Sequence, residues 1–453
     1  AQTNEGIAYG IGEGILSIKQ TFFEDATDVK FLTLAGREIH VGQSLLSPSE
    51  TISLMAGQHI KGLEQQKWMN VPTQGSSQPH QSAIYLDGST ILRSKGISLT
   101  SLEEGAAIHS KGLLQATDED IIIRARGDIY LDKLVAHRNL NIETTGKVFF
   151  GNQTFVGGNV RVKAENIAID KELSSVGRLY LKASKHLSVN GTLGSKENMN
   201  LVGQGAIDFR GNITSHGAFI AVSKGTISQE GSLFARDSVR MKGQSFIKNG
   251  SLVAQSFIKI LTEGDIDNQE GEITSSHWSK FSSKVGKIIN TGRILAGGAI
   301  TAEAKETQNS GFIHTRDILK TNKDFFNQKY GTIEAKSLSL PLAVLTRNVG
   351  TIGLQDDLKL KATAAVLRGN IATQGRIDIG GQDLTVEGQI STKQGFSFDN
   401  LKTLTNKGTI SAFGAGFQGK IATLHNEGKI DCSSANTWIR KTTNQKTGII
   451  RTR

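Results

Sequence analysis

The chain has 453 residues and a net charge of +10, with 51 glycines, 4 prolines and a single cysteine. Glycine exceeds its usual share of about 7% and proline falls far below its usual share of about 5%, which excludes collagen and proline-rich linkers. The 37% of hydrophobic residues suffice for a buried core, whereas aromatic residues, at 6%, are too few for a base-stacking platform, so no specific nucleic-acid partner is predicted.

The first section of the chain, residues 1–84, carries a weak repeat. Leu32 and Leu34 are followed about 20 residues later by Ile52 and Leu54. The chain starts at Ala1 without an initiator methionine or a signal-like segment, so we expect a fragment or a processed chain. No apolar run here or further on approaches the roughly 18 residues of a membrane span, and no transmembrane segment is predicted.

The weak repeat fails between Gly62 and Ser82, where the sequence is polar and contains Pro72 and Pro79. We predict a polar loop excursion near residues 62–82 that leaves the body of the fold. Long loops on rigid scaffolds often carry function, and a tolerated insertion is the alternative interpretation. This excursion makes residues 1–84 the less regular section and residues 85–453 the regular one.

In the regular section, a glycine followed two residues later by isoleucine or leucine recurs about every 20 residues. Asparagine often stands just before the glycine, and both residue types tolerate a left-handed backbone, which predicts a corner of the chain at each position. The recurring glycines are Gly191, Gly211, Gly231, Gly250, Gly271, Gly292, Gly311, Gly331, Gly350, Gly369, Gly388, Gly408, Gly428 and Gly448.

Between these corners apolar and polar residues alternate, as in Leu179, Leu181 and Ala183. A period of two indicates half-buried strands, about three short ones in each repeat. The repeat is too short for a propeller blade of about 40 residues, and one strand triplet cannot bury its apolar side alone, so successive coils must stack. The sequence therefore predicts an all-β fold, a right-handed parallel β-helix (solenoid) of about 20-residue coils, with a bulge or an edge at Pro341.

The repeat unit, L-x-L-x-A/G-x3-L-x-x-x-G-x-I, resembles the haemagglutinin repeats of filamentous-haemagglutinin-like exoproteins of two-partner secretion, a group that includes contact-dependent inhibition proteins. The resemblance spans roughly residues 85–450 and, more weakly, residues 1–60. It implies a β-helical shaft that is secreted through an outer-membrane transporter. The sequence lacks the Asn-Pro-Asn motifs of the secretion domain and the Val-Glu-Asn-Asn boundary before a toxin domain. The match is therefore to a middle, shaft-like section.

From this resemblance we expect an extracellular shaft of a large secreted bacterial exoprotein that acts in adhesion or in display of a distal domain. The implied location is secreted or at the bacterial cell surface, as for virulence adhesins. The implied partners are a host-cell or target-cell surface receptor or an acidic glycan, and the outer-membrane transporter. We expect no cofactor and no enzymatic activity. Two alternatives from other classes are a polysaccharide-cleaving β-helix enzyme (lyase or glycoside hydrolase) and a phage tailspike-like fibre.

Two sets of residues are candidates for contact with a receptor or a glycan. Arg126, Gly127 and Asp128 spell an integrin-type motif, but they lead directly into an alternating strand at Ile129, so a turn before that strand is the simpler interpretation. Near the end of the chain, basic residues without an intervening acid are candidates for anionic-glycan contact. These residues are Arg440, Lys441, Lys446, Arg451 and Arg453.

Catalytic and metal sites are not predicted. Glycoside hydrolysis needs two carboxylates that face the scissile bond, whereas adjacent residues on a strand point to opposite faces. The ten histidines are scattered without metal-ligand spacing, and Cys432 has no cysteine partner. The carboxylates weighed as catalytic candidates, and interpreted instead as solvated turn residues, are Glu103, Glu104, Asp118, Glu119, Asp120, Asp356 and Asp357.

Overall fold

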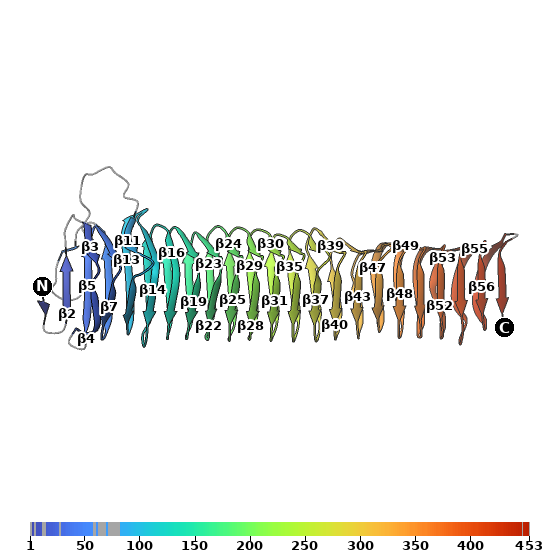
Figure 1. Ribbon diagram of the computed structural model, residues 1–453. Coiled ribbons are helices and arrows are strands. Elements are labelled where there is room, and N and C mark those ends of the chain that lie inside the picture. The colour runs from blue at the N-terminus through green and yellow to red at the C-terminus, as the bar shows by residue number, and fades with distance from the viewer. Residues whose placement is uncertain are drawn as a thin grey trace. The chain divides into compact units, whose positions relative to one another are not determined.

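The computed structural model of the chain describes residues 2–3, 6–10, 15–26, 29–57, 60–61, 69–70, 82–445 and 447–452, and these form strands and turns without a helix. They divide into two compact units, residues 1–225 (unit 1) and 226–453 (unit 2). Within each unit the strands of successive coils lie side by side (Figure 1). The all-β, parallel solenoid predicted from the repeat is confirmed.

A regular coil has three strands, as in β20 (Val160–Ala164), β21 (Asn166–Ile169) and β22 (Glu172–Ser175). Each strand pairs in parallel with the strand one coil further on, which is β23, β24 and β25 respectively. Each unit therefore has three parallel sheets, called here the first, second and third sheet in chain order, around one core.

Some strands of unit 1 run through two of these sheets or pair antiparallel. β14 (Ala107–Ala116) and β16 (Ile129–Ala136) run from the second sheet into the third, β1 (Gln2–Thr3) pairs antiparallel with β2, and β9 (Ile60–Lys61) pairs antiparallel with β10 (Met69–Asn70). The first sheet contains β2 (Gly6–Gly10), β5 (Phe31–Gly36), β8 (Thr51–Ala56), β13 (Gly96–Glu104), β15 (Ile121–Arg126), β17 (Leu140–Thr144), β20, β23 (Leu179–Ala183), β26 (Met199–Gly203) and β29 (Phe219–Ser223). The second contains β3 (Ile15–Lys19), β6 (Glu38–Gly42), β11 (Ser82–Leu86), β18 (Lys147–Phe150), β21, β24 (Leu187–Val189) and β27 (Ile207–Phe209). The third contains β4 (Phe22–Ala26), β7 (Leu45–Pro48), β12 (Ile91–Ser94), β19 (Gln153–Val156), β22, β25 (Thr192–Ser195) and β28 (Asn212–Ser215).

Unit 2 begins with regular coils and ends with coils in which the first and second strands are continuous. The first sheet contains β32 (Val239–Gly243), β35 (Ile258–Thr262), β38 (Ser279–Ser283), β41 (Ile300–Glu303) and β44 (Ile318–Thr321). The second contains β30 (Ile227–Gln229), β33 (Phe246–Lys248), β36 (Ile266–Asn268), β39 (Lys287–Asn290), β42 (Glu306–Asn309) and β45 (Asp324–Asn327). The strands that span both are β47 (Ser337–Asn348), β49 (Leu358–Leu367), β51 (Arg376–Val386), β53 (Gly395–Asn406), β55 (Phe417–Asn426) and β57 (Ala435–Asn444). The third contains β31 (Ser232–Ala235), β34 (Ser251–Ala254), β37 (Glu272–Ser275), β40 (Arg293–Ala296), β43 (Phe312–Thr315), β46 (Thr332–Ala335), β48 (Thr351–Leu354), β50 (Asn370–Thr373), β52 (Gln389–Thr392), β54 (Thr409–Ala412), β56 (Lys429–Cys432) and β58 (Ile449–Thr452).

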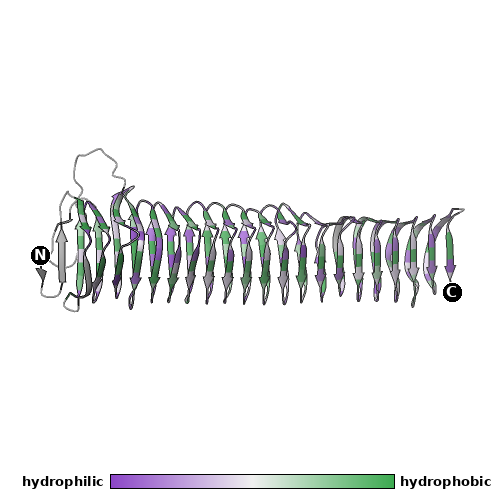
Figure 2. Cartoon of the chain, in the orientation of Figure 1, coloured by the Kyte–Doolittle hydropathy of each residue, from purple (hydrophilic) through white to green (hydrophobic). Residues whose placement is uncertain are grey.

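The core of each unit consists of the inward-facing residues of its three sheets. In β23, Leu179, Leu181 and Ala183 are all 0% exposed, and the residues between them face outward. The predicted apolar residues two positions after the glycines are equally buried, for example Leu193 at 0% and Ile213 at 1%, except Ile450 on the last strand at 44%. Figure 2 shows hydrophobic and hydrophilic residues alternating along the strands. The alternation read from the sequence is thus the division between core and surface.

The recurring glycines do mark corners, but not for the predicted reason. Their backbone is not left-handed; the glycines with positive φ lie elsewhere, for example Gly381 and Gly416. Successive coils instead approach too closely for a side chain, since a Cβ on Gly211 would lie 1.7 Å from the Gly191 carbonyl oxygen. Close stacking of coils, rather than backbone conformation, requires glycine there.

The asparagines before the glycines also differ from the prediction, because several point into the core. Asn290, Asn309, Asn348, Asn406 and Asn426 are at most 1% exposed, and none of them has a positive φ. Their carboxamides hydrogen-bond to one another from coil to coil, as between Asn290 Nδ2 and Asn309 Oδ1 at 2.7 Å. They form a ladder in which each buried carboxamide is a hydrogen-bond partner for another, instead of supplying a left-handed corner.

Of two other sequence features, the bulge can be placed and the loop cannot. The bulge predicted at Pro341 is present, because the register of β47 against β49 shifts between Leu340 and Ala343. The predicted loop near residues 62–82 lies outside the described residues except for Met69, Asn70 and Ser82. The domain boundary expected at residue 84 stays a prediction.

Candidate functional site

The Arg126–Gly127–Asp128 motif forms the turn between β15 and β16. Arg126 is exposed and Gly127 is buried, and a Cβ on Gly127 would lie 2.6 Å from the carbonyl oxygen of Ala106. Asp128 Oδ1 accepts a hydrogen bond from the backbone N–H of Lys147 at 2.7 Å, and Oδ2 accepts one from the Tyr130 hydroxyl at 3.2 Å. The carboxylate serves the packed turn, which favours the structural interpretation; receptor binding through this motif stays a prediction.

The basic residues near the end of unit 2 lie on its last strands. Arg440 and Lys441 are exposed on β57, and Arg451 is exposed on β58, where it lies opposite Asp431. Lys446 and Arg453 lie outside the described residues. Glycan contact through this group stays a prediction.

Three of the carboxylates weighed as catalytic candidates, Asp120, Asp356 and Asp357, bond to groups of neighbouring coils. Glu103 and Glu104 instead end β13, and Glu103 Oε1 is buried without a hydrogen-bond partner among the described residues. Asp120 Oδ1 accepts hydrogen bonds from the backbone N–H and the side-chain Nδ2 of Asn139, at 3.1 and 2.9 Å. Asp357 Oδ1 accepts one from the backbone N–H of Arg376 at 2.9 Å, and Asp356 forms an ion pair with Lys336. Across the described ranges, no cluster of three or more histidine, cysteine or acidic side chains could hold a metal ion.

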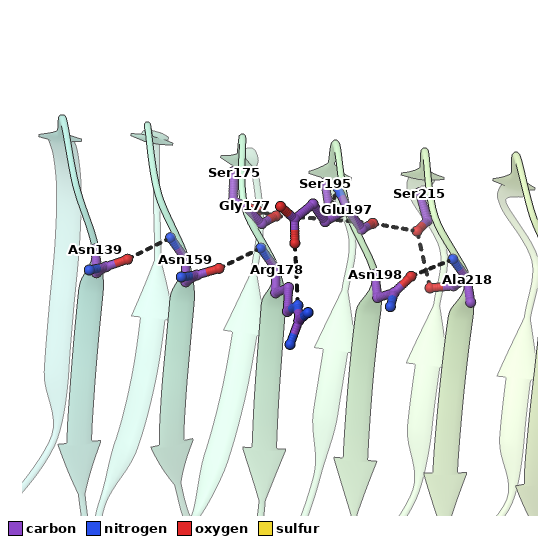
Figure 3. A network of polar contacts seen from close by, with 10 residues as sticks. All are labelled: Asn139, Asn159, Ser175, Gly177, Arg178, Ser195, Glu197, Asn198, Ser215 and Ala218. Atoms are coloured by element: carbon purple, nitrogen blue, oxygen red, sulfur yellow. Dashed lines mark hydrogen bonds and ion pairs between the residues drawn. The ribbon is translucent and has the colours of Figure 1, made fainter.

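The same kind of turn bonding continues along unit 1 (Figure 3). Asn139 Oδ1 accepts from the backbone N–H of Asn159, and Asn159 Oδ1 accepts from that of Arg178, both at 2.8 Å. Asn198 Oδ1 accepts from the backbone N–H of Ala218 at 2.9 Å. These residues occupy one corner on successive coils, so a side-chain ladder fixes the register of the first sheet.

An outward-facing column of rings lies on the second sheet of unit 1. His40, Tyr85, His109 and Tyr130 occupy register-paired positions, with ring centroids 4.8, 5.4 and 4.5 Å apart in that order. A groove of about 320 Å³ runs beside the column and includes Gly42. His40 meets Tyr85 edge to face, whereas Tyr85, His109 and Tyr130 stack, and the first three of these four rings line the groove.

Burial changes the protonation behaviour of two rings in this column. It lowers the pKa of His109, an effect that nearby Asp128 opposes and Lys111 strengthens, so the imidazole is neutral at physiological pH. Burial and the Asp128 carboxylate raise the pKa of Tyr130. Both shifts favour the uncharged forms of His109 and Tyr130, which fits packing of these two rings better than proton transfer.

Lys248 is a buried ionisable residue that the sequence analysis did not single out. It ends β33, is 0% exposed, and donates a hydrogen bond from Nζ to the Gly250 carbonyl oxygen. Burial lowers its pKa to about 8, while nearby Glu272 acts in the opposite direction. The alternation along the strand could have indicated this burial, because Lys248 lies two residues after inward-facing Phe246 and therefore faces the core as well.

Comparison with known proteins gives one family match. The model of the haemagglutinin repeat matches residues 82–133, 156–270 and 283–327, all within the coils described above. No curated protein and no solved structure matches the chain significantly. The described residues contain no helix long and apolar enough to cross a membrane.

Proposed function

The chain is a haemagglutinin-repeat protein that resembles the filamentous haemagglutinins, and on this premise we propose that it is the extracellular shaft of a secreted adhesin. Proteins of this repeat family are secreted or cell-surface exoproteins, generally structural or adhesive rather than enzymatic. The observation that carries the proposal is the coincidence of the matched repeats with register-paired coils, such as β23 on β20 and β35 on β32.

Such coils suit a mechanical role. Each coil contacts mainly its neighbours and contributes the same strand hydrogen bonds and core side chains, so length can be added without a new core. Outward residues recur at the strand spacing of about 4.8 Å, which presents regular columns of side chains to a partner. Columns of weak contacts reach useful strength through repetition. Export through an outer-membrane transporter and display of a distal domain belong to the same proposal.

The proposal is tested by binding of the purified, fluorescently labelled chain to epithelial and bacterial cells. An adhesive shaft gives saturable binding that unlabelled chain competes away. A chain that binds neither cell type would contradict adhesion by this segment and leave display of a distal domain as its role.

A second measurement addresses the enzyme alternative. The chain is incubated with acidic and neutral polysaccharides, and polymer size is followed by chromatography. We expect every polymer to keep its length. A shortened polymer would contradict the shaft proposal and direct attention to carboxylates on neighbouring coils.

A further inference from the structure

Charged residues that meet on neighbouring coils are mostly of opposite sign. In unit 1, Lys163 pairs with Glu143, and Lys185 with Glu165. Unit 2 continues the pattern with the ion pairs Lys284–Glu263, Arg293–Glu272, Lys287–Glu306 and Arg368–Glu387. Opposite charges placed directly across neighbouring strands stabilise a sheet, and like charges destabilise it.

The first sheet of unit 2 departs from this pattern further than that of unit 1, where one like-charged pair, Lys163 and Lys182, is register-paired. Arg240 on β32 is register-paired with Lys259 on β35, which is register-paired with Lys280 on β38, so three cations form one outward column. Lys242 lies two residues beyond Arg240 and faces the same side. Lys280 pairs with Glu303 at 2.8 Å, whereas Arg240, Lys242 and Lys259 form no ion pair with any described residue.

An aromatic pair borders this column at the start of the same strands. The rings of Phe257 and Trp278 stack with centroids 4.3 Å apart and planes at 7°, and the Arg240 guanidinium lies 5.1 Å from the Phe257 centroid. Trp278 is 39% exposed. The position one coil further on is Ala299, beside Gly298, so no large side chain covers the indole there.

We propose that these residues, Arg240, Lys242, Lys259, Phe257 and Trp278, form a binding site for a linear anionic polysaccharide. The inference rests on the proposed adhesive function and names a partner for it. Carboxylate or sulfate groups would pair with the three cations, and a sugar ring would stack on the indole of Trp278. A column of like charges is locally unfavourable, and proteins keep such an arrangement where function requires it. An anionic ligand would relieve the repulsion between the cations of the column.

The dimensions suit an extended polymer. At about 4.8 Å per coil, the column from Arg240 to Lys280 extends about 10 Å, enough for roughly two sugar residues. A single-stranded nucleic acid also combines anions with stacking groups, but it needs separate rings for successive bases. Phe257 and Trp278 cover each other, which leaves one platform and favours a polysaccharide.

The test measures affinity of the whole chain for alginate, chondroitin sulfate, neutral dextran and a single-stranded oligonucleotide. We expect binding to alginate, to chondroitin sulfate or to both, weakened at about 0.5 M salt because exposed charges are then screened within a few Å. Alginate carries carboxylates but no sulfates, so binding to it shows whether the site recognises carboxylates alone. Tighter binding to dextran or to the oligonucleotide would overturn the proposal.

The variant R240S/K242S/K259S is compared with K393S/K402S/K407S, which removes the same charge from exposed lysines elsewhere in unit 2. The first should lose at least about tenfold in affinity and the second less than about twofold, since each exposed ion contributes up to about 1 kcal/mol. W278A should lose about fivefold, from one stacking contact. Equal losses in the two triple variants would show a non-specific charge effect and overturn the site.

The same variants separate this inference from the proposed function. If R240S/K242S/K259S binds both cells and anionic polysaccharide as well as the unmodified chain does, adhesion stands and the polysaccharide site is wrong. If the unmodified chain binds anionic polysaccharide but no cells, the site stands and adhesion by this segment is wrong. Far-ultraviolet circular dichroism of each variant confirms that the strands are intact.

Discussion

Units 1 and 2 use the same coil but fill one of its corners with different chemistry. The corner column is the set of inward-facing residues that end the second strand on successive coils. In unit 1 it is apolar apart from Ser110, and its members Leu131, Phe150, Ile169, Val189 and Phe209 are at most 1% exposed. These side chains stabilise the corner by removing apolar surface from water and by close packing.

In unit 2 the corner column is mainly polar. Gln229 and Lys248 are followed by an asparagine ladder in which each Nδ2 donates to the Oδ1 one coil further on, at 2.6 to 2.8 Å. The donors and acceptors run in order through Asn268, Asn290, Asn309, Asn327 and Asn348. Leu367 and Val386 interrupt the ladder, and it resumes at Asn406, Asn426 and Asn444.

The ends of the ladder show what each member contributes. Asn268 Oδ1, Asn348 Nδ2 and Asn406 Oδ1 are buried without a hydrogen-bond partner, and each lies where the ladder starts or stops. A buried amide costs about 1–3 kcal/mol when unpaired and stabilises only when its neighbours pair it. The polar column is therefore cooperative along its length, whereas each apolar residue contributes on its own.

The largest expected effect comes from placing asparagine in the apolar column. Val189→Asn combined with Phe209→Asn removes two buried side chains and leaves the ends of a two-residue ladder unpaired. We expect a loss of about 5 kcal/mol in local stability, measured by hydrogen exchange of β24 and β27. Ser188→Asn with Asp208→Asn, at the adjacent outward positions, is the matched control and should change little.

The next effect is a charge inside the ladder. Asn309→Asp removes the donor to Asn327 Oδ1 and buries a carboxylate, at an expected cost of about 3 kcal/mol at neutral pH. The cost should shrink in acid, because the protonated carboxyl can donate again. Hydrogen exchange of β42 measures the loss, and Asn249→Asp, at an exposed corner, is the control. A pH-independent loss would argue against the ladder.

The third prediction concerns the direction in which stability around Lys248 changes with pH. Its pKa falls from 10.5 to about 8 on folding, so between these values the unfolded chain binds more protons and stability rises with pH. Lys248→Asn should abolish that rise and, by supplying a donor to Asn268 Oδ1, stabilise β33 by up to about 3 kcal/mol below pH 8. Parallel pH profiles of variant and unmodified chain, from hydrogen exchange of β33, would contradict this account.

The smallest effect is expected where the ladder is interrupted. Leu367→Asn with Val386→Asn gives up two apolar side chains but pairs Asn348 Nδ2 and Asn406 Oδ1 through a continuous ladder. The two contributions are of similar size, so we expect a net change within about 1 kcal/mol. Thermal unfolding followed by circular dichroism provides the first comparison, and either single substitution should be more destabilising than the pair.

The sequence predicted the strands and the stacking because alternation and the spacing of glycines are local signals. Whether an asparagine faces the core or the solvent also follows from the alternation along its strand. Asn290 lies two residues after inward-facing Ile288 and so faces inward, whereas Asn190 lies one residue after inward-facing Val189 and so faces outward. The glycine signal alone does not distinguish these two cases. Left-handed corners were therefore predicted for residues that build a buried ladder.

The cationic column could not be predicted in the same way. Arg240, Lys259 and Lys280 are about 20 residues apart, and intervals of 19 and 21 residues bring them together only once the register of β32, β35 and β38 is known. Composition indicated an excess of positive charge, and the basic run near residue 440 drew the prediction there. Which outward residues become neighbours in a solenoid depends on the register of its strands. Because the repeat length varies, the sequence alone does not show that register.

One measurement tests the central claim, that the two corner columns are stabilised differently, most directly. Hydrogen exchange is recorded for Val189→Asn with Phe209→Asn and, in parallel, for Leu367→Asn with Val386→Asn. The account predicts a loss of protection worth about 5 kcal/mol around the first pair and a change within about 1 kcal/mol around the second. Equal losses at the two sites would contradict it, because asparagine would then be no better accommodated in the polar column than in the apolar one.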